Sequence, residues 1–353
     1  VLDSEDIYVS ALLGCVQMAK AGITCFAESG TIEVAPIIQA AIDTGMRANI
    51  SRMSRDCGDF IPRKFKEPTN VVVKKTEELY KEFNGAGNGR IEIAFSVTSL
   101  QTTSPDLLTQ VAEASRAYGT ILHVHLAEHL AEVAQCLSLY GLRPVEFLER
   151  YGALGPNLLG AHSVQLTDRE IRILAEYDSK PVHCPYSNLG SHGFPKTHTM
   201  VALGLKVGIG TDGASITDLN LFEQMRVLKY SINARYGLPV FDPATLPIDI
   251  LFKFSTINNA AALGIEDKVG SIEVGKKADI VLLDWLQPHF YPSQRAFPMV
   301  VMVATSRDVC DVIIDGRLVV RDRRHQLVDE EEIMLKAKER LDFILKKVAN
   351  GER

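Results

Sequence analysis

The chain has 353 residues, of which 46% are hydrophobic and 23% charged, and its formal net charge is −6. That length is enough for one large α/β domain with a smaller appendage. The basic residues are scattered and no apolar run approaches the roughly 20 residues that cross a bilayer, so we expect neither nucleic acid nor a membrane as a partner. Six cysteines without a CxxC pair, and no signal-peptide pattern, favour a cytoplasmic protein.

Helical and β-type segments alternate along the chain up to about residue 212. A helical pattern over residues 6–22 comes first. Seven strands are then predicted, at residues 23–28, 46–53, 90–97, 120–126, 158–163, 180–184 and 205–210. Amphipathic stretches that often end at glycine separate them, which is the pattern of parallel βα units. We therefore expect an α/β fold, a (β/α)8 TIM-type barrel over residues 1–265, whose first strand is missing from this chain.

The pattern changes after about residue 265. Short alternating strands with Gly and Asp turns, including the hairpin-like sequence IDGRLVV, predict a small β-sandwich part over residues 266–330. The segment 297–306 fits a helix as well as a strand. Residues 331–353 have apolar residues at helical spacing, acids early and bases late, so they predict a final helix that packs on the barrel.

The sequence LHVHLAEH, residues 122–129, places three histidines and a glutamate at the end of an apolar run. If it were helical, His125 to His129 would form the inverted zinc-peptidase motif H-x-x-E-H. If it ends a strand, His123 and His125 share one face, and Glu128 lies in the next loop, where it can turn back over His125. The apolar residues just upstream favour the strand end.

Polar residues recur where later strands are predicted to end, namely His162, His183 and Asp212. Each alone is weak evidence, because a lone strand-end histidine is as often structural and an Asp before Gly is usually a turn. Together with His125 and Glu128 they occupy successive strand ends, where barrel enzymes assemble their chemistry. The set predicts a hydrolytic site in which a divalent ion, bound by imidazole and carboxylate, lowers the pKa of a water molecule.

Each member of this set has a predicted role. Glu128 would pass a proton from the water to a leaving nitrogen, which requires a carboxylate within reach of both. His162 would orient or polarise the attacked group or the hydroxide. Asp212 would bind the ion or accept the proton of the water.

These residues resemble those of the amidohydrolase superfamily, in its branch of cytosine, guanine and methylthioadenosine deaminases and triazine chlorohydrolases. The matching stretches are HVHLAEH, LLGAHSVQL, HCPYSN, VGIGTDGAS and VGSIEVGKKADIVLLD. The resemblance implies a distorted (β/α)8 barrel, a β-sandwich built from both chain ends, one zinc or iron ion, and hydrolytic attack on an aminated or halogenated heteroaromatic ring.

Residue roles follow from the same resemblance. It implies metal ligation by His125 and Asp212, proton transfer by Glu128, and a place beside the hydroxide for His162. Asp212 would also act as a base. Three further residues would lie next to the site without contacting the substrate: His183 would contact the site residues, and Ser187 and Asn188 would shape the adjoining loop.

Two features of the resembling family are absent. These are the N-terminal sandwich strands and the H-x-H pair of the first barrel strand, which supplies two more ligands. Residues 1–22 instead predict the helix that precedes the second strand. Because His125 and Asp212 are fewer ligands than a tight catalytic zinc site uses, a metal-free and inactive barrel is the alternative.

Three residues outside the motifs are candidates for substrate contact. Arg52 and Arg55 lie at and just after the end of residues 46–53, the third strand of the expected barrel, and could bind a carboxylate, a phosphate or a ribose, although a solvated loop arginine is the simpler explanation. His192 lies in the loop before the last predicted strand, either as a surface histidine or lining the substrate site.

The sequence thus predicts a metal-dependent hydrolase acting on carbon–nitrogen bonds other than peptide bonds. A hydrolytic deaminase of a purine-like or nucleoside-like ring is the first expectation. Hydrolysis of a chlorotriazine, an amide or an imidazolone on the same scaffold is the second, and an inactive barrel is the third. Zinc is the expected ion with iron second, a small heterocycle is the expected substrate, and a homodimer is left open.

Overall fold

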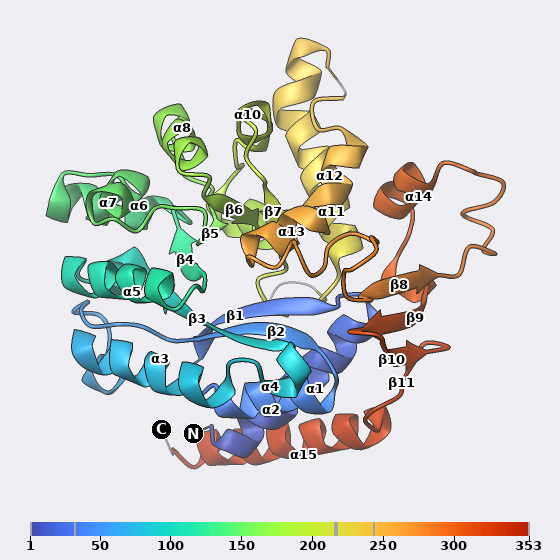
Figure 1. The fold of residues 1–353 in the computed structure, drawn as a ribbon, viewed down its shortest axis with the longest axis horizontal. Coiled ribbons are helices and arrows are strands. Elements are labelled where there is room, and N and C mark those ends of the chain that lie inside the picture. The colour runs from blue at the N-terminus through green and yellow to red at the C-terminus, as the bar shows by residue number, and fades with distance from the viewer. Residues whose placement is uncertain (1, 32, 215–217, 243, 352–353) are drawn as a thin grey trace.

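Seven parallel strands form one curled sheet in the computed structural model, which describes residues 2–31, 33–214, 218–242 and 244–351 (Figure 1). In order across the sheet they are β1 (Cys25–Thr31), β2 (Arg47–Arg52), β3 (Ile91–Val97), β4 (Leu122–Leu126), β5 (Leu158–His162), β6 (Lys180–His183) and β7 (Gly208–Ile209). Each overlaps one of the seven predicted strands, and the (β/α)8 type of fold is confirmed.

Helices follow the strands and cover the outer face of the sheet (Figure 1). Those associated with the barrel are α1 (Ser4–Lys20), α2 (Ala35–Asp43), α3 (Thr69–Phe83), α4 (Ala86–Gly89), α5 (Pro105–Ala117), α6 (Leu130–Tyr140), α7 (Pro144–Arg150), α8 (Asp168–Glu176), α9 (Pro185–Ser187), α10 (Thr197–Ala202), α11 (Leu221–Ile232), α12 (Ile248–Phe254) and α13 (Ile257–Ala262).

Helix α5 shows why these segments are helical. Ser104 caps it by accepting the N–H of Leu107, Pro105 begins its first turn, and the buried residues Leu107, Leu108 and Val111 recur on one face.

A second sheet of four antiparallel strands follows the barrel, in the order β11-β10-β9-β8. Its strands are β8 (Ile280–Leu283), β9 (Val309–Ile314), β10 (Arg317–Arg321) and β11 (Arg324–His325). The predicted hairpin is confirmed: Asp315 and Gly316 both have positive φ, 51° and 78°, as a tight two-residue turn between twisted strands requires. The ambiguous segment 297–306 falls largely in helix α14 (Ala296–Met302).

Long-range ion pairs tie this second sheet and the last helix to the barrel. Arg47, at the start of β2, makes two 3.0 Å hydrogen bonds to the carboxylate of Asp279, and both side chains are almost fully buried. Helix α15 (Glu330–Ala349) packs on α1, where Arg340 binds Asp3 and Asp6 at 2.6 Å. The domain boundaries at residues 265 and 330 stay predictions.

The described part of the chain contains no helix that combines the length and the hydropathy of a bilayer-spanning segment. Two sets of predicted residues fall partly beyond it. Ser215, the last residue of the VGIGTDGAS stretch, and residues 352–353 of the predicted final helix lie outside the described residues.

Candidate active site

The predicted site residues lie at the carboxyl ends of neighbouring strands. His125 is the penultimate residue of β4, His162 ends β5 and His183 ends β6. Asp212 follows β7 by three residues. His129 is the N-cap of α6, so the H-x-x-E-H stretch is a strand end followed by a helix start, and the helical peptidase alternative is wrong.

His162 lies at the centre of the cluster. Its Nε2 atom is 3.8 Å from Oε1 of Glu128 and 4.0 Å from Oδ1 of Asp212. Its ring centroid is 5.5 Å from that of His125, and the two rings are nearly parallel at 25°. The structure therefore brings together four residues that the sequence spreads over 88 positions, from His125 to Asp212.

Sharp turns in the backbone aim these side chains at a common place. Ala127, His162, Ser163 and Asp212 all have positive φ, between 47° and 70°. Non-glycine residues seldom adopt this left-handed conformation, and it recurs at strained functional sites. Each of the three loops concerned thus has a left-handed residue within three positions of the end of its strand.

Hydrogen bonds fix the proton on the His162 ring. The side-chain oxygen of Asn188 accepts the Cys184 N–H at 2.9 Å, so the Asn188 amide nitrogen faces His162 and donates to its Nδ1 atom at 2.9 Å. Burial lowers the pKa of His162 to about 4, so the ring is neutral at pH 7. A neutral ring that accepts at Nδ1 carries its hydrogen on Nε2, which makes His162 a donor toward the two carboxylates.

Two of the residues predicted to support the site, His183 and Asn188, contact His162. His183 is buried, and its Nδ1–H donates to the carbonyl oxygen of His162 at 2.8 Å. Burial lowers the pKa of His183 to about 4. Ser187 ends the short buried helix α9, which delivers Asn188 to the His162 ring. These contacts hold the end of β5 in place.

His192 joins the cluster through Glu128. Its Nε2 atom is 3.1 Å from Oε1 of Glu128, and its side chain is only 16% exposed. Its ring lies 5.9 Å from the ring of His162, and Gln165 donates a side-chain hydrogen bond to its carbonyl oxygen. The structure therefore places His192 beside Glu128, with most of its side chain buried, and not on an open surface loop. Contact of His192 with a substrate stays a prediction.

Glu132, which lies outside the sequence motifs described above, also belongs to this region. Glu132, in the first turn of α6, is 2% exposed and accepts the backbone N–H groups of Ala127 and Glu128, each at 2.9 Å. Burial raises its pKa to about 7. A sequence signal for this role exists. Glu132 lies three residues after the N-cap His129, and a glutamate at that position commonly accepts a backbone N–H from the residues before the helix.

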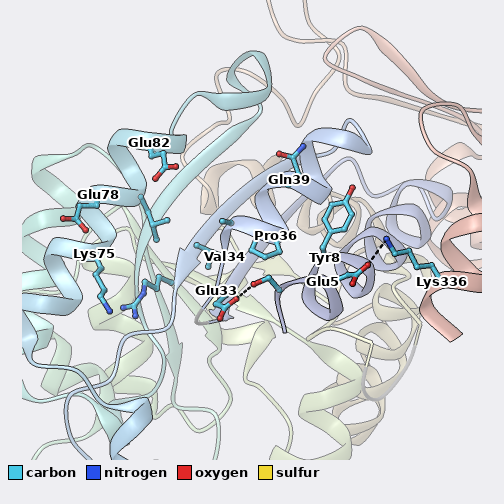
Figure 2. A pocket seen from close by; sticks show the side chains of 14 residues that line it. Glu5, Tyr8, Glu33, Val34, Pro36, Gln39, Lys75, Glu78, Glu82 and Lys336 are labelled. Carbon is cyan, nitrogen blue, oxygen red and sulfur yellow. Dashed lines mark hydrogen bonds and ion pairs between the residues drawn. The ribbon is translucent and has the colours of Figure 1, made fainter. Parts of the chain in front are cut away.

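The two predicted substrate arginines are placed differently from the histidines. Arg52 is buried and forms a 2.6 Å ion pair with Glu67. It lines a groove of about 850 Å³ between α1, α2, α3 and α15, which includes none of the clustered histidines (Figure 2). Arg55 has a buried Nε atom without a hydrogen-bond partner among the described residues. Substrate binding by either residue stays a prediction.

The described residues fit a metal ion only in part. The Nδ1 atom of His125 is buried and has no hydrogen-bond partner in the described ranges, so that ring has an uncommitted nitrogen. Asp212 offers a carboxylate whose side chain is 34% exposed. Nevertheless, no group of three or more His, Cys, Asp or Glu side chains within the described ranges is arranged to hold an ion. His125 and Asp212 are thus part of a coordination shell that usually has four members.

Comparison with known sequences gives consistent matches over almost the whole chain. A 5-methylthioadenosine/S-adenosylhomocysteine deaminase of Moorella thermoacetica is 34% identical over 342 residues, covering 96% of this chain and 77% of the relative. A 5'-deoxyadenosine deaminase of Methanobrevibacter smithii is 34% identical over 344 residues, covering 97% of this chain and 77% of the relative.

Solved structures agree with the fold. An adenosine deaminase from Xanthomonas campestris with bound zinc superposes with a TM-score of 0.90 at 27% identity, covering 98% of this chain and 77% of that one. An atrazine chlorohydrolase from Arthrobacter aurescens complexed with zinc has a TM-score of 0.88 at 24% identity, with coverages of 96% and 77%, and supports the fold alone. The model of the amidohydrolase family matches residues 1–319, and the chain belongs to that family.

Proposed function

We propose that this protein is a hydrolytic deaminase of a purine-like ring, acting on an adenosine-type nucleoside. The observation that supports it best is the meeting of Glu128, His162 and Asp212 at successive strand ends. The relatives named as methylthioadenosine and deoxyadenosine deaminases support the substrate class. In the reaction, water adds to the ring carbon that carries the amino group, the carbon–nitrogen bond breaks, and ammonia leaves.

The residues of the cluster divide this work. Glu128 takes a proton from the attacking water and delivers it to the leaving nitrogen, since its carboxylate reaches into the cluster from the β4–α6 loop. His162, neutral and hydrogenated on Nε2, donates a hydrogen bond to the attacking oxygen. Asp212 accepts a hydrogen bond or a proton from the same oxygen.

A divalent metal ion belongs to this proposal, and zinc is the ion we favour because the structurally similar adenosine deaminase carries it. His125 and Asp212 would hold it together with donors beyond the described cluster. When bound, such an ion lowers the pKa of a water molecule to about 7.

The proposal is tested by ammonia release from adenosine, 5'-deoxyadenosine, 5'-methylthioadenosine and S-adenosylhomocysteine, using protein loaded with zinc. We expect turnover of at least one nucleoside and its loss on chelation. The substitution Glu128→Gln should lower kcat by about 10²- to 10⁴-fold, the usual contribution of a positioned proton carrier.

Two results would count against the proposal. One is the absence of ammonia from every nucleoside. The other is ammonia release that neither chelation nor the Glu128→Gln substitution reduces. Chloride release from a chlorotriazine without ammonia release would favour the alternative hydrolase instead.

A further inference from the structure

We propose that Glu132 is the positioning residue for Glu128, because its buried carboxylate fixes the peptide that carries the proton-transferring side chain. The role of Glu128 rests on the proposed function, whereas the hydrogen bonds of Glu132 to the preceding loop are contacts of the structure, described below.

The first observation is the reach of the Glu132 side chain. In an ordinary capping box, the glutamate three residues after the N-cap bonds to the N–H of the N-cap residue itself. Here His129 is the N-cap and its Nδ1 atom accepts the Glu132 N–H at 3.2 Å. The Glu132 carboxylate instead extends one and two residues further back, to the N–H groups of Glu128 and Ala127. It therefore holds the loop that precedes the helix.

The second observation is that the same peptide is also held from its other side. The carbonyl oxygen of Ala127 accepts the N–H groups of Val164 at 3.1 Å and Gln165 at 2.8 Å. Ala127 has φ 47°, a left-handed conformation that is unfavourable for an L-residue and must be stabilised by its contacts. With both ends of this peptide bonded, the backbone of Glu128 is fixed, and its carboxylate moves only by side-chain rotation.

The third observation is a contrast with the next helix. Glu170 has the same place in the first turn of α8, is also buried, and caps that helix through Thr167. Its charge is balanced by Arg143, at 2.7 Å. Among the described residues no Lys or Arg forms an ion pair with Glu132. Burial of a carboxylate that has no cation as a partner costs free energy. A helix can be capped without this cost, so capping alone does not account for the buried position of Glu132.

The test compares Glu132→Gln with Glu170→Gln in the zinc-loaded protein. The Glu132→Gln substitution keeps the shape of the side chain but replaces one of its two acceptor oxygens by an NH₂ group. One of the two backbone N–H groups then faces a donor and loses its hydrogen bond. We expect kcat for deamination to fall by about 10- to 100-fold, as displacement of a reacting group by about 1 Å can cause. KM should change less than about three-fold, because substrate binding itself is not altered.

The pH dependence of kcat separates positioning from mere stabilisation. The pH profile of kcat should change in Glu132→Gln and stay in place in Glu170→Gln. Equal kcat values and equal pH profiles in the two variants would overturn the proposal.

Amide hydrogen exchange gives a readout that needs no activity. The amides of Ala127 and Glu128 should exchange faster in Glu132→Gln than in the unsubstituted protein, while those of β4 stay protected. If no nucleoside is turned over, the proposed function fails, and this measurement still decides whether Glu132 holds the peptide. Unchanged exchange rates of both amides would show that Glu132 does not hold this peptide in place.

Discussion

At the scale of single residues, Asn188 decides what His162 can do. The Cys184 N–H fixes the orientation of the Asn188 amide, and that amide in turn makes Nδ1 of His162 an acceptor. His162 is thereby left with a hydrogen on Nε2 that faces Glu128 and Asp212. Asn188 thus sets which ring nitrogen of His162 carries the hydrogen.

The substitution Asn188→Asp tests this chain of bonds. A carboxylate would accept both the Cys184 N–H and a hydrogen on Nδ1 of His162, so the hydrogen would leave Nε2 and the pKa of His162 would rise. We expect kcat to fall by about ten-fold or more, as for the loss of one donor to the attacking oxygen, and the ¹⁵N chemical shifts of the His162 ring to change.

A matched control is Asn157→Asp, just before β5, where the asparagine donates to Ser115 and Thr120 far from the histidines in the fold. It should leave kcat and the His162 shifts close to those of the unsubstituted protein. Identical ring shifts in Asn188→Asp and the unsubstituted protein would contradict the assignment.

The sequence predicts those site residues that end strands. His125, His162 and Asp212 could be found because parallel strands end at one edge of a barrel, and Glu128 because it follows such an end by only a few residues. The pair of Glu128 and His192 could not, since these residues are 64 positions apart and their contact depends on the paths of two loops. Loop paths carry no periodic signal in the sequence.

At the scale of elements, periodicity located every strand of the parallel sheet but overestimated the last one. Residues 205–210 were predicted, whereas β7 is Gly208–Ile209. The amide of Asn259 bonds the backbone of this short strand. It accepts the Ile209 N–H and donates to the Ile209 carbonyl oxygen, both at 2.9 Å, so a side chain from α13 satisfies both backbone groups of Ile209.

Removal of this side chain should therefore destabilise the end of the sheet. Asn259→Ala leaves both backbone groups of Ile209 without their partner, at a cost of about 1–3 kcal/mol in the free energy of unfolding. Urea unfolding measures it. The neighbouring Asn258→Ala removes one hydrogen bond, to the Val207 carbonyl oxygen, and should cost less. Equal losses in both variants would refute the special role of Asn259.

At the scale of the whole molecule, the two-part architecture follows from the change of pattern near residue 265, but the contacts that join the parts do not. Arg47 and Asp279 are 232 positions apart, and each alone looks like an ordinary charged residue. Only the folded chain shows that both are buried together. The long-range ion pairs of Arg340 with the first helix are hidden from the sequence for the same reason.

Buried imidazoles should make the whole molecule sensitive to acid. Burial lowers the pKa of His123 to about 3 and those of His162 and His183 to about 4, against an ordinary value of 6.5. The unfolded chain binds these protons at higher pH than the folded one. The resulting stability is present above pH 6.5 and is lost as the pH falls toward 4.

We expect the free energy of unfolding in urea to fall steadily between pH 6.5 and pH 4. His183→Asn keeps a donor for the His162 carbonyl oxygen but does not titrate, so its stability should fall less steeply over that interval. A pH dependence as steep as that of the unsubstituted protein would show that His183 does not take part in acid unfolding.

Hydrogen bonds link the loops at the strand ends to one another. Ala127 joins the loop after β4 to the loop after β5, and Gln165 joins that loop to His192 after β6. Displacement of any one of these three loops would therefore break hydrogen bonds to its neighbour, so a substitution that loosens one loop should also disturb the next.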